Sequence, residues 1–198
     1  MELPEDFCTL MRQQYGDEVA GNLFEGLSQE PTVSIRLNPK KACQILSAGD
    51  ELSTVNCQLS SSDKVAWCPE AYYLNQRPAF TFDPLFHAGV YYVQEASSMY
   101  LAEVLRRYAP LGNMPANGFA LDLCAAPGGK STLLRSLLPE EWVLVSNEPM
   151  AKRAQVLAEN MTKWGHPHSI VTQNYPADFT FLSSQFDVIV TDVPCSGE

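Results

Sequence analysis

The 198-residue sequence predicts an α/β protein in which a smaller α+β domain, residues 1–115, precedes a parallel, doubly wound sheet in residues 116–198. From residue 120 onward, apolar strand patterns alternate with helical patterns, as in βαβ units. Before residue 110 the chain is instead rich in aromatic, β-prone segments between short helices. A loop at 111–118 with three Gly or Pro residues marks the junction between the two parts.

The first 38 residues predict two helices and a strand. Apolar residues between Phe7 and Leu27 follow helical spacing, interrupted at Tyr15–Asp17, which indicates two short amphipathic helices. Residues 32–38 alternate apolar and polar side chains before a proline, which is typical of a half-buried strand. Arg36 lies on the polar side of this strand. With Lys40 and Lys41 it is expected to form a solvated edge, the commoner case, or to contact RNA phosphates.

The segments 64–74 and 79–94 are aromatic-rich and β-prone, with a bend allowed at Gly89 before a strand at 90–93. Their rings are expected to pack in a core more often than to stack on nucleic-acid bases. Ser97 or Ser98 is expected to cap a helix that ends near Tyr108.

The second part predicts four strands and two helices in alternation. The apolar patterns place strands at 120–123, 142–146, 169–172 and 186–191, and helices at 131–138 and 149–164. In a parallel sheet of this kind, ligands bind at the carboxyl ends of the strands.

Composition excludes several classes of protein. A net charge of -10 argues against binding nucleic acid through bulk electrostatics, so RNA would have to be met by a local patch. The six cysteines include no C-x-x-C pair, and neither a metal site nor a disulfide framework is expected. The sequence shows no leader peptide and no membrane span, which predicts a cytoplasmic protein.

Residues 120–134, ALDLCAAPGGKSTLL, form the strand, turn and helix at the centre of the predicted site. The glycines allow close approach of the backbone, and the free N–H groups at the helix start favour an acidic ligand. A phosphate-binding P-loop would need glycine at Cys124, and the dinucleotide pattern G-x-G-x-x-G is absent. A cofactor with a ribose, an adenine and an amino-acid tail but no phosphate suits the turn, because Lys130 and nearby N–H groups can meet a carboxylate.

Polar residues follow each predicted strand: Asp122, Asn147 with Glu148, Gln173 with Asn174, and Asp192 with Cys195. Glu148 comes 26 positions after Asp122, near the offset of about 20 residues at which dinucleotide folds place the acid that binds ribose hydroxyls. The alternative for Glu148 is an acid that stabilises the start of a helix.

The motifs LDLCAAPGGKSTLL, SNEP at 146–149 followed by Arg153, and TDVPCSGE at 191–198 together resemble the S-adenosyl-L-methionine (AdoMet)-dependent RNA 5-methylcytosine methyltransferases. The segments IRLNP, WCPEAYYL and HAGVYYVQEASSM are similar to the N-terminal region of that family. The resemblance therefore covers most of the chain. It implies a Rossmann-like AdoMet methyltransferase sheet, truncated here after its fourth strand, and an N-terminal domain that positions RNA.

The resemblance also implies roles for individual residues. The methionine part of AdoMet would be wrapped by the turn, which comprises Cys124, Ala125, Ala126, Pro127, Gly128, Gly129 and Lys130. Glu148 would hold the ribose, with Arg153 close by, and Asn174 would lie near the adenine, although relatives often have an acid in this slot. Asp192 would contact both the cofactor and the target cytosine, and Pro194 would shape the turn.

Cytosine C5 is too weak a nucleophile to be methylated directly, so a cysteine thiolate must first add to C6. Cys195 would be that nucleophile if its position after Asp192 alone decided the assignment. The family resemblance instead implies that Cys195 assists product release, whereas the attacking cysteine belongs to a Thr-Cys motif after the next strand. That motif is absent from these residues, so the chain is expected to be the N-terminal part of a longer enzyme, inactive by itself.

The function expected from the resemblance is methylation of cytosine C5 in RNA, with 16S ribosomal RNA as the expected substrate and AdoMet as cofactor. Two alternatives stay open at this point. One is an AdoMet methyltransferase acting on another base or on a protein, and the other is a non-catalytic RNA-binding or assembly module. A Thr-Cys dipeptide downstream would distinguish the cytosine C5 methyltransferase from both alternatives. AdoMet binding would distinguish the two kinds of enzyme from the non-catalytic module.

Overall fold

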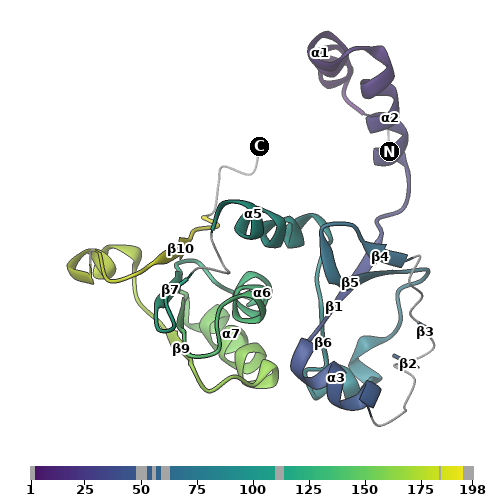
Figure 1. Ribbon diagram of the computed structural model, residues 1–198. Coiled ribbons are helices and arrows are strands. Elements are labelled where there is room, and N and C mark those ends of the chain that lie inside the picture. The colour runs from purple at the N-terminus through teal and green to yellow at the C-terminus, as the bar shows by residue number, and fades with distance from the viewer. Residues whose placement is uncertain are drawn as a thin grey trace. The chain divides into compact units, whose positions relative to one another are not determined.

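A computed structural model describes residues 3–47, 53–54, 57–58, 63–109, 114–182 and 184–193 (Figure 1). The chain divides into two compact units, residues 1–32 and residues 33–198. The predicted boundary at residue 115 separates two sheets that both lie in the second unit, and it stays a prediction.

The first unit is a pair of helices, α1 (Glu5–Tyr15) and α2 (Asp17–Ser28), joined at Gly16 with φ of 82°. Phe7 and Phe24 pack ring against ring with centroids 6.2 Å apart, and Arg12 lies over the Phe24 ring. The two helices predicted from apolar spacing are confirmed.

The second unit opens with an antiparallel sheet in the order β4-β5-β1-β6. Its strands are β1 (Val33–Leu37), β4 (Lys64–Val65), β5 (Cys68–Leu74) and β6 (Tyr91–Val93). Helix α3 (Pro39–Ser47) follows β1, and a two-stranded pair, β2 (Ser53–Thr54) and β3 (Cys57–Gln58), follows α3. One core cluster packs residues of β1, β5 and β6 against Phe80.

The segment 79–94 is only partly a strand. It forms a 3-10 turn, η2 (Phe80–Phe82), then the one-turn helix α4 (Pro84–His87), and only then β6. The Asp83 side chain accepts a hydrogen bond from Leu85 N, which starts α4. The strand predicted at 90–93 after a bend at Gly89 is confirmed as β6, whereas the β-prone residues before it form helical turns, which this cap and Pro84 favour.

Arg36 corrects a second prediction, because it lies neither at a solvated edge nor at an RNA-facing surface. Strand β1 is central in its sheet and both of its faces are covered, so Arg36 is 1% exposed. Its guanidinium donates to Thr132 Oγ1 at 2.6 Å and to Gln94 Oε1 at 3.0 Å, and it lies 4.7 Å from the Trp164 ring centroid. The polar side of β1 therefore faces the second half of the unit, not water.

The second half contains a parallel sheet in the order β10-β7-β8-β9, as predicted for a doubly wound fold with four strands. The strands are β7 (Phe119–Asp122), β8 (Val143–Asn147), β9 (Ser169–Thr172) and β10 (Val188–Val190). Helices α6 (Gly129–Leu137) and α7 (Ala151–Trp164) cross between them, and η5 (Pro176–Leu182) precedes β10. Apolar side chains of β7, β8, α6 and α7 form its core.

Helix α5 (Leu101–Tyr108) precedes this sheet and is entered through a 3-10 turn, η3 (Ser97–Tyr100). The predicted cap is wrong: the Ser97 hydroxyl donates to Glu95 Oε1, and no side chain caps either helix start. The predicted end at Tyr108 is confirmed. The junction loop at 111–118 lies partly outside the described residues.

The two halves of this unit meet at the carboxyl end of α7, where residues of the first half bind its last carbonyl groups. Asn38 Nδ2 donates to Trp164 O at 2.9 Å, and Lys41 Nζ donates to Lys163 O at 2.5 Å. Gly89 lies so close to this helix end that a Cβ atom there would stand 2.0 Å from Lys163 O. With φ of 68°, Gly89 also needs the left-handed conformation. These contacts bring the start of β6 beside the carboxyl end of α7.

Candidate cofactor site

The turn at 124–130 connects β7 to α6, and backbone hydrogen bonds hold its conformation. Ala125 N donates to Asn147 O at 2.8 Å, and Gly128 N donates to Ala125 O at 2.8 Å. The Ala126–Pro127 peptide is cis, and Gly128 adopts φ of 113° just before α6 begins. Gly129 and Lys130 at the N-terminus of α6 line the space beside the turn, and free N–H groups at a helix start favour a negatively charged ligand group.

A cavity of about 310 Å³ lies in that space, and we call it the strand-end cavity. Its lining combines the turn, the end of β10, and the segment that contains β6 and η3. The lining residues are Tyr92, Val93, Gln94, Glu95, Ser98, Cys124, Ala125, Ala126, Pro127, Gly129, Lys130 and Asp192. Most residues of the predicted cofactor turn therefore meet Asp192 around one cavity, as the converging strand ends suggested.

Lys130 forms an ion pair with Asp192 across this cavity. The sequence suggested that Lys130 would meet a carboxylate of the cofactor; in the structure the carboxylate it binds is that of Asp192. Asp192 remains 60% exposed along its side chain, so this pair is held at the cavity mouth rather than in the core. Pro194 and Cys195, which follow Asp192, lie outside the described residues.

Glu148 is 1% exposed and does not line the strand-end cavity. Its Oε1 accepts a hydrogen bond from Met150 N at 3.0 Å, as an acid near a helix start would. Its Oε2 lies 3.4 Å from Arg153 Nη2 but accepts no hydrogen bond. Arg153 donates instead to Ala126 O at 2.9 Å, so the same side chain touches both the acid and the cofactor turn.

Asn147 fixes the ends of three strands relative to one another. Its side chain is fully buried, and its Nδ2 donates to Leu123 O and to Asn174 O. Its Oδ1 accepts hydrogen bonds from Thr172 Oγ1 and from Asn174 N, each at 2.9 Å. Asn174 is thus placed by its backbone, and it is exposed beside the carboxyl end of β9.

Asp122 ends β7 as a fully buried acid. Burial raises the pKa of its carboxyl group to about 6, although the Ser131 hydroxyl donates to Oδ2 at 2.7 Å and partly opposes the shift. Its Oδ1 has no hydrogen-bond partner. Partial burial also raises the pKa of the Cys124 thiol, and the nearby Glu148 and Asp122 carboxylates act in the same direction.

The sequence reasoning missed the contribution of the segment 92–98 to the cavity. Gln94 is 8% exposed, and its Nε2 is a buried donor with no partner, next to Gly129. The motif YYVQEASSM supported the resemblance, but nothing in its spacing shows that β6 reaches the cofactor turn. Only the packing of the first sheet against α6 and α7 brings it there.

Two models of protein families match the chain. Residues 3–96 match the N-terminal domain of 16S rRNA methyltransferase RsmF, and residues 111–198 match 16S rRNA methyltransferase RsmB/F. The chain belongs to the RsmB/F family of 16S rRNA methyltransferases. The family predicted from the cofactor turn and the D-x-P-C-S-G motif is confirmed.

Relatives in this RsmB/F family match along the whole chain. Ribosomal RNA small subunit methyltransferase F of Cronobacter sakazakii is 33% identical over 99% of this chain, and that of Pectobacterium atrosepticum is 32% identical over 99%. The chain spans 40% of the length of each of these two relatives.

Solved structures show the same fold. A methyltransferase homolog protein from Pyrococcus horikoshii superposes with a TM-score of 0.75 at 25% identity, over 98% of this chain and 60% of that one. NSun6 from Pyrococcus horikoshii with SFG shares the fold, with a TM-score of 0.64 at 16% identity, over 97% of this chain and 71% of that one. The chain thus has the methyltransferase sheet predicted from its sequence, and its cofactor is AdoMet.

The residues present fit AdoMet, a ligand with an acidic group, an ammonium group and a ribose diol. The α6 N-terminus and Gln94 Nε2 offer donors for the carboxylate, while Asp122 Oδ1 and Glu148 Oε2 are buried acceptors without hydrogen bonds. Buried polar atoms are almost always hydrogen-bonded, so three that lack a hydrogen bond near one turn are consistent with a polar ligand there, although Glu148 Oε2 also forms an ion pair with Arg153. The individual contacts of Glu148, Arg153 and Asn174 with AdoMet stay predictions.

No group of three or more His, Cys, Asp or Glu residues that could hold a metal ion occurs in the part of the chain that the structure describes. In the same part, no helix is both long enough and apolar enough to cross a membrane.

Proposed function

We propose that the full-length protein transfers a methyl group from AdoMet to C5 of a cytosine in 16S ribosomal RNA, in the cytoplasm. The observation that carries the proposal is the strand-end cavity, which joins the cofactor turn to Asp192 and holds the unpaired donor of Gln94. The family match supports RNA as the substrate, because the matching relatives are ribosomal RNA methyltransferases.

The mechanism follows from the electron demand of cytosine. A cysteine thiolate adds to C6, the π electrons of the C5–C6 double bond move to C5, and C5 becomes nucleophilic. AdoMet supplies an electrophilic methyl group when bound. A base then removes the C5 proton, the C5–C6 double bond re-forms, and the thiolate leaves C6. The cytosine ends with one methyl group in place of one proton, and the enzyme is unchanged.

In this proposal, two residues of this chain act on the target cytosine. Asp192 hydrogen-bonds the cytosine and thereby orients C5 toward the methyl group, and its ion pair with Lys130 holds it at the cavity mouth until RNA arrives. Cys195 assists the elimination step, and a second cysteine of the full-length protein provides the attacking thiolate. The cofactor turn binds AdoMet through Cys124–Lys130.

The proposal is tested with full-length protein, AdoMet carrying a labelled methyl group, and 16S rRNA from cells that lack the enzyme. We expect one protected cytosine in bisulfite sequencing, and loss of that protection in the Asp192→Asn variant. Methylation of another base, or label in a ribosomal protein instead of the RNA, would show that the assignment of cytosine is wrong.

A further inference from the structure

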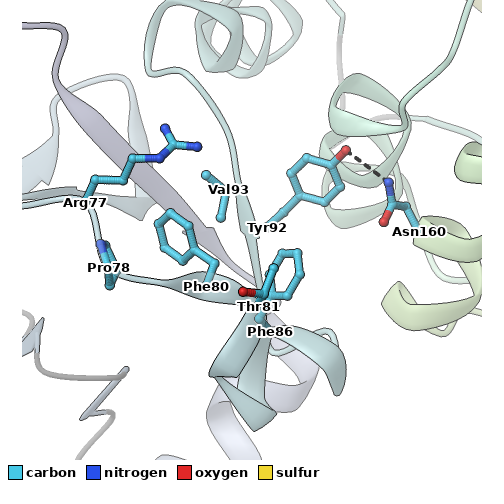
Figure 2. Close-up of a pocket in the computed structure, with 8 residues that line it drawn as sticks. All are labelled: Arg77, Pro78, Phe80, Thr81, Phe86, Tyr92, Val93 and Asn160. Atoms are coloured by element: carbon cyan, nitrogen blue, oxygen red, sulfur yellow. Dashed lines mark hydrogen bonds between the residues drawn. The ribbon is translucent and has the colours of Figure 1, made fainter.

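A second cavity, of about 410 Å³, shares Tyr92 and Val93 with the strand-end cavity (Figure 2). We call it the aromatic cavity. Three of its side chains are aromatic rings, one is a cation and one is an amide. It is lined by Arg77, Pro78, Phe80, Thr81, Phe86, Tyr92, Val93 and Asn160. Its volume lies within the range of about 300–1,000 Å³ typical of ligand sites.

Two cations lie over rings of this cavity. The guanidinium carbon of Arg77 is 5.9 Å from the Phe80 ring centroid, and Lys163 Nζ is 5.5 Å from the Phe86 ring centroid. None of the eight lining residues is acidic, although the whole chain carries a net charge of -10. The aromatic cavity is therefore a local site where a negatively charged ligand is favoured.

The polar edge of the aromatic cavity is bonded to the cofactor turn. Asn160 Nδ2 and the Tyr92 hydroxyl both donate to Pro127 O, at 2.8 Å and 3.3 Å, and Asn160 Nδ2 also lies 3.5 Å from the Tyr92 hydroxyl. Figure 2 shows this Tyr92–Asn160 contact at one side of the cavity. These bonds use the amide nitrogen of Asn160 and leave its amide oxygen as an acceptor.

Partly buried aromatic rings, a guanidinium with no ion pair among the described residues and an amide oxygen are all groups that can bind single-stranded RNA. Rings stack on bases, arginine binds phosphate, and an amide oxygen accepts from a base edge. An apolar peptide side chain would fill the cavity but would make no use of the two cations.

We propose that the aromatic cavity binds one unpaired nucleotide of the RNA substrate, with its base against Phe86 and Tyr92 and its phosphate near Arg77. The inference rests on the proposed function, because it takes RNA as the substrate. A nucleotide bound here would be separated from the strand-end cavity by β6, since Tyr92 and Val93 of this strand border both cavities. It would therefore hold the RNA beside the site of methyl transfer.

The test uses full-length protein without AdoMet and a fluorescent single-stranded oligoribonucleotide covering the methylated position, titrated by anisotropy at several salt concentrations. We expect Arg77→Ala to weaken RNA binding at least about fivefold and to reduce the salt slope by about one. Phe86→Leu keeps most of the apolar volume and removes the ring, and we expect it to weaken RNA binding about fivefold or more.

Arg107→Ala is the matched control, because Arg107 is an exposed arginine on α5 that pairs with Glu103 and lies outside the cavity lining. It should bind RNA as the wild type does. AdoMet affinity, measured by calorimetry, should be unchanged in all three variants.

Equal RNA affinities for the wild type, Arg77→Ala and Phe86→Leu would overturn the inference and leave the proposed function standing, provided the wild type methylates RNA. A parallel loss of AdoMet affinity would also overturn it, since the cavity would then act only on the cofactor turn. An effect seen with intact ribosomal subunits but not with the oligoribonucleotide would assign the cavity to a protein partner instead. A wild type that binds RNA but transfers no methyl group contradicts the proposed function alone.

Discussion

Arg36 Nε donates a hydrogen bond to Gln94 Oε1 at 3.0 Å, and this contact decides which end of the Gln94 amide faces the strand-end cavity. A guanidinium has only donors, so the amide oxygen must point toward Arg36. Gln94 lines the cavity, and its buried amide nitrogen lies next to Gly129 without a hydrogen-bond partner. A buried arginine in the first sheet thus orients a donor beside the cofactor turn.

Gln94→Met is expected to weaken AdoMet binding about threefold to tenfold, because one hydrogen bond contributes about 0.5–1.5 kcal/mol. Isothermal titration calorimetry with the full-length protein measures the change. Gln155→Met is the matched control, since Gln155 is exposed on α7 and its side chain donates to Glu159. Identical dissociation constants for Gln94→Met and the wild type would remove Gln94 from the cofactor site.

Glu148→Ala is expected to weaken AdoMet binding about tenfold or more. Its buried Oε2 accepts no hydrogen bond in the structure, and a charged acceptor contributes about 1.5–3 kcal/mol for each ribose hydroxyl that it binds. The same titration measures it, with the exposed Glu159→Ala as control. If Glu148→Ala binds AdoMet normally, Glu148 serves only the start of α7.

Asp122 gives a prediction about pH. Its folded-state pKa of about 6 lies above the value of 3.8 for an unburied carboxyl group, so the folded protein binds more protons between these pH values. The stability that Asp122 contributes is therefore complete below about pH 4 and is lost as pH rises through about 6. Because burial is the main cause of the raised pKa, replacing Asp122 with a residue that cannot ionise should stabilise the folded protein above this pH range.

We therefore expect Asp122→Asn to gain stability relative to the wild type as pH rises from about 4 to 7, by at most roughly 3 kcal/mol. Asparagine keeps an acceptor for Ser131 and cannot ionise. Urea unfolding at a series of pH values measures the difference between the two proteins. A difference that does not change with pH would show that Asp122 is ionised in the folded protein throughout this range.

Gly89→Ala is expected to lower the free energy of unfolding by about 2 kcal/mol or more. The new Cβ would stand 2.0 Å from Lys163 O, in a backbone conformation with φ of 68° that side chains rarely adopt. Gly21→Ala is the control, because Gly21 lies in the interior of α2 and a Cβ atom there would have no neighbour within 4 Å. That control should be neutral or stabilising by up to about 1 kcal/mol in thermal unfolding. Equal stability of Gly89→Ala and the wild type would contradict the close packing against α7.

Cys195→Ala in the full-length protein is expected to leave enzyme covalently attached to RNA. If Cys195 assists elimination, addition to C6 survives its loss and the thioether accumulates. Mutation of the attacking cysteine should abolish the attachment. A denaturing gel with labelled RNA distinguishes the two, and the reverse pattern would make Cys195 the nucleophile.

Local sequence patterns predicted the parallel sheet well, because apolar periodicity and turn residues are local properties. The strand at 169–172 and the convergence of Asp192 with the turn after Asp122 are both confirmed. Strands β7, β8 and β9 are joined by α6 and α7 as consecutive βαβ units and lie side by side, whereas β10 returns to pair with β7.

Contacts between distant segments could not be predicted in the same way. Arg36 alternates with apolar residues as an exposed side chain would, yet α6 and α7 cover it, and nothing in residues 32–38 encodes that cover. Gln94 was missed for the same reason. Its role depends on Arg36, which is 58 residues away, and on the packing of β6 against the cofactor turn.

The capping of α7 by Asn38 bears on how this protein can be recombined. Asn38 leaves the ribosome 126 residues before Trp164, the residue whose carbonyl group it binds, so the cap can be in place before the helix is made. The two segments that match separate family models therefore cannot be exchanged independently. In a chimera that replaces residues 3–96 with those of a relative, the last carbonyl groups of α7 stay hydrogen-bonded only if the new sequence supplies an amide at position 38 and a cation at position 41.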